Sequence, residues 1–234
     1  MSPTEPRDEI DSEMVRYYAA RAGEYDDWYL RRGRYSHGRS ADEEWRHDLD
    51  AAATWLEGRP FHGRVVELAA GTGWWSTSLA RRSALTLYDA SAEPLDRARI
   101  RLTAAGLDAE VGVRDAWAEP DQSVDGVFAG FWLSHVDRSR LDEFVALVAR
   151  WLVRGGLFAF IDSRHDPDSG ASDHRPPEDD LQVRRLDDGS SFRVRKVYYE
   201  PAALDSALRR AGFGQIEVAT TGRFFLLGSA RRGA

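Results

Sequence analysis

Apolar and polar residues alternate along most of this chain in blocks that predict strands and helices in turn. Five short, nearly continuous apolar runs have the length and the branched side chains of buried strands. They are residues 64–68, 84–88, 109–113, 124–131 and 157–162. The segments between them have helical spacing, at 75–82, 92–105 and 138–152. Apolar strands that alternate with helices predict a parallel sheet that is covered on both faces.

The residues before this alternating part predict two further helices. Residues 11–22 have an acidic first turn and predict a short helix that Gly23 ends, whereas the polar residues 1–10 are predicted to be loosely attached. Residues 41–57 place their apolar side chains on one helical face, and Gly58 follows as a C-cap. We therefore expect helices to precede the sheet.

The residues after the alternating part predict a loop, a hairpin and a final pair of strands. Residues 164–180 are rich in Asp, Pro, Ser and Gly and are predicted to be a mobile loop. Residues 181–199 predict a hairpin around an Asp-Gly turn. A helix at 201–211 and strands at 215–220 and 223–229 complete the chain.

The stretch that joins the first predicted strand to its helix carries Glu67, Gly71 and Gly73. A glycine turn after a strand lets the backbone approach a nucleotide-like ligand, and the helix N-terminus faces that ligand. Ser76 stands where the dinucleotide fingerprint needs its third glycine, which weakens a pyrophosphate-binding interpretation. Asp89 ends the second predicted strand, where a carboxylate can accept hydrogen bonds from a ribose diol. The alternative for Asp89 is a solvated or helix-capping role.

The third and fourth predicted strands end in residues that suit the rest of a nucleoside and a reactive centre. Asp115 can accept a hydrogen bond from an exocyclic amine, and Trp117 can lie against a base. The alternative is a surface loop with a core tryptophan. The fourth strand runs into the aromatic stretch 128–135, which suits a pocket that excludes water.

Composition narrows the class of protein. The 234 residues are 42% hydrophobic and 30% charged, as in a soluble chain with one large domain. The net charge of −7 argues against a nucleic-acid partner. With no cysteine, disulfides, thiolate zinc sites and cysteine nucleophiles are excluded. The N-terminus lacks an apolar signal region, and no apolar run reaches the ~20 residues that span a bilayer, so no membrane and a cytoplasmic location are predicted.

Together these motifs resemble the class I methyltransferases that use S-adenosylmethionine, particularly the small-molecule type. The resemblance rests on Glu67-x-Ala69-x-Gly71-x-Gly73, Asp89, Asp115-Ala116, the run Val124-Asp125-Gly126-Val127, and Gly155-Gly156. It covers the chain from about Tyr17 to the C-terminus, and its motifs are specific for the cofactor rather than for the methyl acceptor.

The resemblance implies an α/β fold, a Rossmann-like three-layer sandwich. Its seven-stranded, mostly parallel sheet has the order 3-2-1-4-5-7-6 with strand seven antiparallel, an N-terminal helical cap, and a hairpin insertion after strand five. The expected single domain divides into a cap at 11–57, a cofactor-binding core at 64–162, an insertion at 163–200 and a C-terminal helix with two strands at 201–234.

The resemblance also implies roles for residues at the strand ends. Glu67, Gly71 and Gly73 would hold the methionine part of the cofactor, Asp89 the ribose, and Asp115, Ala116 and Trp117 the adenine. Phe131 would lie beside the sulfonium, and Tyr25 would cover the amino-acid end. The expected cofactor-binding residues are Tyr25, Glu67, Ala69, Gly71, Gly73, Asp89, Ala90, Asp115, Ala116, Trp117 and Phe131.

A sulfonium methyl is already activated, so its transfer needs alignment in a dry pocket, and a hydroxyl acceptor benefits from a base. His135, just past the fourth strand, is the best-placed catalytic base by sequence, and a structural histidine is an equal alternative. His37 and His165 are weaker candidates. No His and carboxylate cluster has a convincing metal-binding spacing, so metal independence is expected.

The acceptor pocket is expected to form from the N-terminal helices and the insertion. Candidate substrate-binding residues are Tyr18, Tyr29, Arg34, Tyr35, Trp132, Arg164 and Tyr198, with Arg223 in addition. The arginines among them favour an acidic acceptor weakly. For each residue taken alone, a packing aromatic or a solvated cation is the stronger interpretation.

The predicted function is S-adenosylmethionine-dependent methyl transfer to an O or N nucleophile of a small molecule, such as a secondary metabolite. A peptide or protein methyltransferase and a non-catalytic S-adenosylmethionine-binding scaffold subunit remain as alternatives. An NAD-dependent oxidoreductase is disfavoured by Ser76. Nucleic-acid methylation is disfavoured because the Asn/Asp-Pro-Pro-aromatic motif is absent after the fourth strand. The oligomeric state is not predicted.

Overall fold

The computed structural model describes residues 6–233, and side chains from residue 9 onward. A seven-stranded sheet with the order β3-β2-β1-β4-β5-β9-β8 forms its centre. All neighbouring strands are parallel except that β9 is antiparallel to both β5 and β8. The strands are β1 (Arg64–Leu68), β2 (Ala84–Asp89), β3 (Glu110–Val113), β4 (Val124–Gly130), β5 (Leu152–Ser163), β8 (Phe213–Thr220) and β9 (Phe225–Arg232).

This architecture confirms the expected fold class. The last two strands of the sheet are the eighth and ninth of the chain, because a separate two-stranded hairpin, β6 (Leu181–Arg185) and β7 (Ser191–Arg195), precedes them. The expected order 3-2-1-4-5-7-6 numbered only the strands of the sheet and left this hairpin out. The hairpin lies after β5, as predicted.

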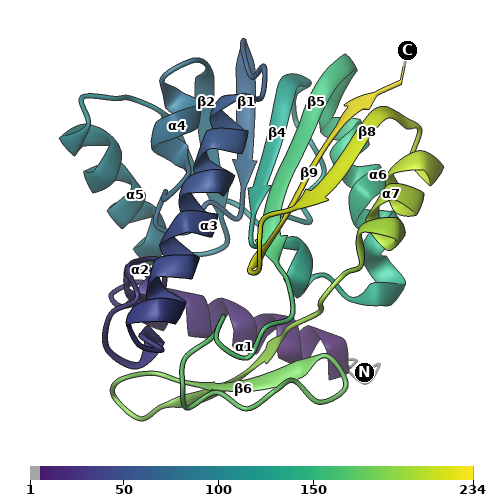
Figure 1. Cartoon of the computed structure of the whole chain (residues 1–234). Helices are drawn as coiled ribbons and strands as arrows, with labels where there is room; N and C mark the ends of the chain where they lie inside the picture. The colour runs from purple at the N-terminus through teal and green to yellow at the C-terminus, as the bar shows by residue number, and fades with distance from the viewer. Residues whose placement is uncertain (1–5, 234) are drawn as a thin grey trace, which may run out of the picture.

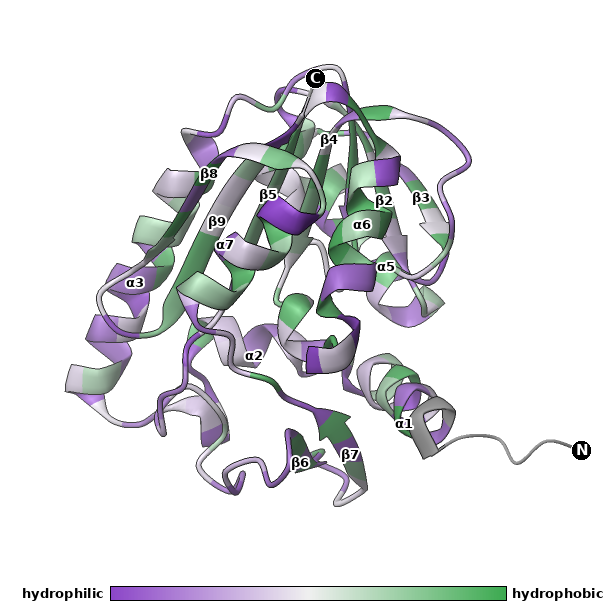
Figure 2. Ribbon diagram, turned by 90° about the vertical axis from the view of Figure 1, so that its right-hand side faces the viewer, coloured by the Kyte–Doolittle hydropathy of each residue, from purple (hydrophilic) through white to green (hydrophobic). Residues whose placement is uncertain are grey.

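Helices cover both faces of the sheet, as unbroken apolar strands require (Figure 1). One core packs α3 (Arg39–Glu57), α4 (Ser76–Ala80) and α5 (Ala92–Ala104) against the sheet, and the second packs α6 (Leu141–Trp151) and α7 (Pro201–Arg210) against the opposite face. Figure 2 shows apolar colour concentrated in the strands between the helices. Within residues 6–233, no helix is both long and apolar enough to cross a membrane.

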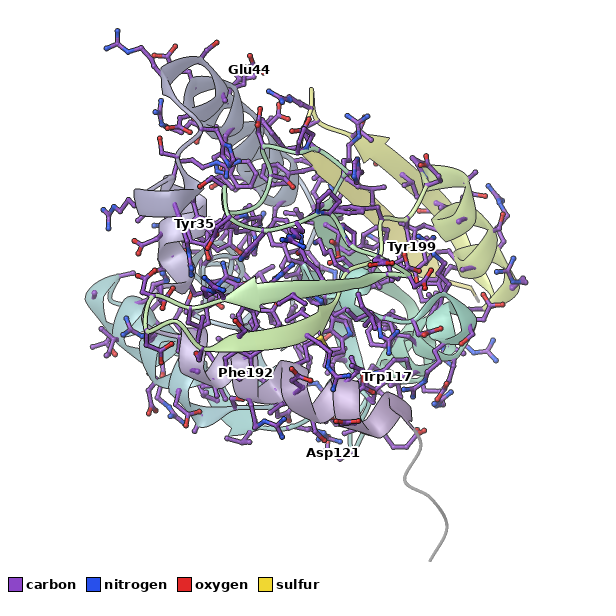
Figure 3. All side chains as sticks on the ribbon, turned by 90° about the horizontal axis from the view of Figure 1, so that it is seen from below. Tyr35, Glu44, Trp117, Asp121, Phe192 and Tyr199 are labelled. Carbon is purple, nitrogen blue, oxygen red and sulfur yellow. The ribbon has the colours of Figure 1, made fainter. Side chains whose placement is uncertain are left out.

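The N-terminal helix and the hairpin lie across the end of the sheet at which the parallel strands finish (Figure 1). Helix α1 (Pro6–Arg21) packs along β7 through a small apolar cluster that includes Met14, Tyr17 and Val194. Figure 3 looks onto this end of the molecule, with the hairpin and α1 side by side and the labelled Phe192 between them. The ends of the parallel strands are therefore covered.

The two largest differences from the predicted boundaries are at the starts of α1 and β5. Helix α1 begins at Pro6, so residues 6–10 are helical rather than loosely attached, and residues 1–5 lie outside the described part of the chain. Strand β5 begins at Leu152 rather than at residue 157, because α6 ends at Trp151 and Leu152 pairs directly with Val124.

The loop at 164–180, predicted to be mobile, is tied to the N-terminal segment and to the turn before β9. The Trp28 indole donates to the Ser169 carbonyl at 2.6 Å, and Arg31 donates to the Asp168 carbonyl at 2.6 Å. Arg223 pairs with Asp166 at 2.7 Å. The polar composition of the loop predicted mobility, but the carbonyls of Asp168 and Ser169 accept hydrogen bonds from side chains far away in the sequence.

Candidate functional site

The carboxylate of Asp89, at the end of β2, accepts a hydrogen bond from the turn after β1 and fixes its position. Gly71, with φ of 56°, donates its backbone N–H to Asp89 Oδ2 at 2.9 Å, and Ser91 N donates to Asp89 Oδ1 at 3.1 Å. Ala69 also has a positive φ, 53°, which is rare for a residue with a Cβ. Burial raises the pKa of Asp89 to about 6, and the backbone donors at Gly71 and Ser91 partly oppose that rise.

Gly73 and Glu67 support this turn from behind. A Cβ on Gly73 would lie 2.8 Å from Ala98 Cβ on α5, so glycine allows the turn and α5 to approach closely. Glu67 is buried and accepts a hydrogen bond from Ser76 Oγ at 2.5 Å. Burial raises its pKa to about 8, against the lowering effect of the Ser76 hydroxyl. In the sequence, Ser76 was notable only because it replaces the third glycine of the dinucleotide fingerprint. In the structure its hydroxyl is the hydrogen-bond partner of the buried Glu67.

A cavity of about 90 Å³, here called the cofactor cavity, opens beside this turn. It is lined by nine of the eleven residues that were expected to bind the cofactor. These are Tyr25, Ala69, Gly71, Asp89, Ala90, Asp115, Ala116, Trp117 and Phe131. Glu67 and Gly73 do not line it, because they lie beneath the turn and against α5. The individual roles of the eleven residues stay predictions.

The cofactor cavity has a polar end and an apolar end, which fits a nucleoside that carries an amino-acid tail. Asp89 and the glycine turn form the polar end. At the other end Trp117 packs edge-on against Phe144, with centroids 5.2 Å apart, and Met14 of α1 contributes to the wall. Phe131 keeps a φ of 56° at the end of β4, and such strained residues cluster at functional sites.

A second cavity of about 180 Å³, here called the acceptor cavity, lies between the sheet and the hairpin. Its walls come from α1, α2 (Tyr25–Leu30), the loop after β5, and the hairpin. Four residues line both cavities: Tyr18, Tyr25, Phe131 and His135. The two cavities therefore meet at a wall of aromatic rings and one imidazole.

Both ring nitrogens of His135 have hydrogen-bond partners, and these partners identify the tautomer. Its Nδ1 lies 2.6 Å from the Arg195 carbonyl, which can only accept, so Nδ1 carries the proton. Its Nε2 lies 2.7 Å from the Tyr18 hydroxyl and accepts from it. Burial, followed by the charges of Lys196 and Arg184, keeps the pKa of His135 well below its ordinary value. The imidazole is neutral near pH 7 and reaches the acceptor cavity beside Tyr18.

Buried guanidinium groups line the acceptor cavity without carboxylate partners. Arg21 donates to the Tyr35 hydroxyl at 3.2 Å, and Arg184 donates to Tyr18 at 3.1 Å and to Gln182 at 3.0 Å. Within residues 6–233, neither guanidinium forms an ion pair with Asp or Glu. The Arg21 Nε is buried without a hydrogen-bond partner in the described part of the structure. Buried charge of this kind normally requires a counter-ion.

Sequence reasoning missed several side chains of the acceptor cavity, among them Arg21, Arg184, Lys196 and His174. Lys196 carried a compositional signal, because it is the only lysine in a chain whose Lys and Arg total 32. Arg184 had no such signal among so many arginines. The His174 Nε2 is buried without a partner among the described residues, and burial lowers the pKa of His174 to about 3, with Arg184 and Arg21 adding to the effect.

The structure brings together some of the predicted substrate-binding residues. Tyr18, Tyr35 and Tyr198 line the acceptor cavity, and so does His165. Trp132 lines the cofactor cavity instead, because it follows β4 on the side of Trp117. Trp132 therefore lies away from the acceptor cavity, and the roles of Tyr18, Tyr35 and Tyr198 stay predictions.

Other predicted substrate-binding residues lie outside both cavities. Tyr29 is buried in the core and stacks on Trp74 at 4.1 Å between centroids. Arg34 turns to Glu24, 2.7 Å away, and Arg164 donates to the carbonyls of Gly222 and Arg223. Each already has partners that hold it away from the acceptor cavity.

His37 and Arg223 also belong to the network around the loop after β5. His37 lies 2.9 Å from the Gly170 carbonyl and Arg223 pairs with Asp166 and Asp168. Across the described residues, no group of three or more His, Cys, Asp or Glu is arranged to hold a metal ion. Metal independence stays a prediction.

Comparison with known proteins finds a family model and several solved structures that are similar to this chain. The family model of a methyltransferase domain matches residues 65–156. A structure described as a DhpI-SAH complex is 30% identical, with 96% of this chain and 97% of that chain covered and a TM-score of 0.75. A DhpI-SAM-HEP complex is 31% identical, with 95% and 97% covered and the same TM-score.

A structure of a methyltransferase from Clostridium acetobutylicum, described as S-adenosylmethionine-dependent, shares the fold at 16% identity. It covers 93% of this chain and 100% of that chain, with a TM-score of 0.61. Comparison with curated proteins gives no match.

Proposed function

The chain belongs to the class I S-adenosylmethionine-dependent methyltransferases, and we propose that it methylates an oxygen of a small anionic acceptor. The product is the methyl ester of an acid group. The observation that carries this proposal is the pair of buried guanidinium groups, Arg21 and Arg184, in the cavity that adjoins the cofactor cavity. Burying a charge without a counter-ion costs free energy, and an anionic ligand that binds beside the charge lowers that cost.

The residues of the shared wall support transfer from one cavity to the other. Phe131 and Tyr25 place aromatic rings between the cavities, and Tyr18 is held at a fixed position by His135 and Arg184. Alignment in a dry site supplies most of what a methyl transfer needs. Fixed side chains on both sides of the wall favour such alignment.

The protonation state of His135 favours an acceptor that is already ionised. With its pKa well below the ordinary value, His135 is a weak base near pH 7, and both ring nitrogens are engaged. Bound S-adenosylmethionine supplies a methyl on a sulfonium: the acceptor's oxyanion bonds to that carbon, the sulfur keeps the electron pair, and no proton moves. Under this proposal His135 positions Tyr18 rather than removing a proton.

The size and enclosure of the acceptor cavity support a small molecule over a protein side chain. Its volume is about 180 Å³, and the hairpin and α1 cover the end of the sheet where it lies (Figure 3). DhpI is described with SAM and HEP bound in one complex. HEP is therefore a sensible member of the first set of acceptors to be tried with this chain.

The proposal is tested with methyl-labelled S-adenosylmethionine and matched pairs of acceptors. Each pair consists of a small carboxylic or phosphonic acid and its neutral amide or ester of the same shape. We expect label in the acids only. For a carboxylic acid, mild base should release the label as methanol, because a methyl carboxylate ester hydrolyses and methyl ethers or amines do not. A monomethyl phosphonate is stable to mild base, so that product is identified by mass spectrometry as the O-methyl ester.

Label transferred equally to both members of each pair, or methyl found on an atom other than an acid oxygen, would contradict the proposal. Binding of S-adenosylmethionine is measured by calorimetry in the same preparation. Cofactor binding without transfer to any acceptor would favour the alternative of a scaffold subunit.

A further inference from the structure

Lys196, the only lysine of the chain, stands directly after β7 and reaches back to the sheet. Its Nζ donates to Ser134 Oγ at 3.0 Å and to Ser163 Oγ at 2.9 Å. Ser134 lies in the segment after β4 and Ser163 is the last residue of β5, so the side chain joins the hairpin to the ends of two strands. Lys196 is 7% exposed and lines the acceptor cavity.

Two hydroxyl partners leave the charge of this ammonium unpaired. Within residues 6–233, no carboxylate lies within ion-pair distance of Lys196. The carboxylate of Asp162 is nearby but is bonded to the backbone N–H groups of Ser134 and Ser163, at 2.9 and 2.7 Å. An ammonium has three donors, and the hydrogen bonds to the serines use two of them.

The charges around Lys196 are mostly positive. Burial lowers the pKa of Lys196 to about 7; Asp162 opposes this, and Arg184 and Arg21 add to it. The titratable and charged groups that face Lys196 or share its cavity are Asp162, His135, Arg184, Arg21, Arg175, Tyr18, Tyr25, Tyr35, Tyr198, His165, Asp166 and His174. Most neighbouring charge therefore opposes protonation when the cavity holds no anion.

We propose that Lys196 is a proton-linked anion-binding residue of the acceptor cavity, which takes up a proton as the acid group of the acceptor enters. This inference rests on the proposed function for the identity of the acceptor, but it concerns binding and needs no methyl transfer. Without a ligand the cavity avoids a third buried positive charge beside the two guanidinium groups. With an anion present, the ammonium is stabilised and acts as a third cationic contact.

The test uses the presence of a single lysine. Protein labelled with lysine carrying ¹³C at Cε gives one lysine Cε resonance, and its chemical shift is followed against pH with and without sulfate, an anion that does not titrate near neutrality. We expect the resonance to titrate near pH 7 without sulfate, and at a pH about one unit higher or more with it. A shift of one unit corresponds to roughly tenfold tighter anion binding by the charged form.

A matched variant separates Lys196 from its titratable neighbours. Sulfate affinity of the wild type should fall as the pH rises from about 7, because the form that binds best is lost. Lys196→Arg keeps its charge at every pH used, so its sulfate affinity should stay constant over the same range. Lys196→Met should bind sulfate about tenfold more weakly than the wild type at pH 6.

A lysine resonance whose titration is the same with and without sulfate would overturn the inference. So would a Lys196→Arg variant whose sulfate affinity falls with pH as steeply as that of the wild type. Both readouts are independent of turnover. If they succeed while no acid is methylated, the proposed function fails alone, and if they fail while acids are methylated, only the role of Lys196 is lost.

Discussion

The two cavities of this protein share a wall but differ in how the chain builds them. The cofactor cavity is formed largely by the ends of successive strands, β1, β2, β3 and β4, with α1 laid over it. The acceptor cavity is formed by α1 and α2 together with the loop after β5 and the hairpin, and the two helices lie more than a hundred residues before that loop in the sequence. The cofactor cavity is thus built mainly by the sheet, and the acceptor cavity is built by the N-terminal helices and the segment inserted after β5.

The cavities also differ in charge. Asp89 and Asp115 line the cofactor side, whereas Arg21, Arg184 and Lys196 line the acceptor side, where the carboxylate of Asp166 is paired with Arg223. Among the described residues, only Tyr18, Tyr25, Phe131 and His135 line both cavities. Burial raises the pKa of Tyr25 and lowers the pKa of His135, which keeps both side chains neutral near pH 7. Neutral side chains therefore separate the carboxylates of the cofactor cavity from the cationic groups of the acceptor cavity.

The largest expected effect breaks the acceptor side alone. In Arg184→Gln the Tyr18 contact is weakened and a buried cation is lost, so kcat/KM for an anionic acceptor should fall about 100-fold, or about 2.7 kcal/mol. Arg185→Gln, on the exposed face of the same strand, is the matched control and should leave turnover unchanged. Calorimetry should show unchanged S-adenosylmethionine affinity in both variants.

Equal losses of turnover in Arg184→Gln and Arg185→Gln would show that the substitutions disturb the hairpin rather than the cavity. A loss of cofactor affinity in Arg184→Gln would contradict the separation of the two sides.

A smaller effect is expected from the corresponding change on the cofactor side. Asp89→Asn keeps the shape of the side chain but removes the charge that Gly71 and Ser91 contact, so S-adenosylmethionine affinity should fall about tenfold, or about 1.4 kcal/mol. Asp96→Asn, on the exposed surface of α5, is the control. The measurement is a calorimetric titration of each variant, and an unchanged affinity in Asp89→Asn removes Asp89 from the cofactor site.

Most of the cofactor side could be predicted from the sequence, because its signals are local. Gly71, Asp89 and Asp115 each stand at the end of an apolar run, and parallel strands bring such ends together. Glu67 and Gly73 show the limit of this reasoning. Their positions in the motif are right, but their side-chain directions depend on how α4 packs against α5, which no local pattern encodes.

The acceptor side could be predicted only in outline. The aromatic N-terminal segment and the insertion were the right regions, yet Tyr29, Arg34 and Arg164 are engaged elsewhere. Which cation enters the cavity depends on contacts across long stretches of chain, such as the bond between Arg184 and Tyr18. Lys196 alone could have been singled out, from its uniqueness in the composition.

The measurement that tests the central claim most directly is the affinity of sulfate for protein saturated with S-adenosylhomocysteine, compared with its affinity for the free protein. If each cavity binds its own ligand, both ligands should bind at the same time. Arg184→Gln should then lower the affinity for sulfate without changing the affinity for S-adenosylhomocysteine. Competition between the two ligands, with sulfate displaced as the cofactor product binds, would place the anion in the cofactor cavity and contradict the account.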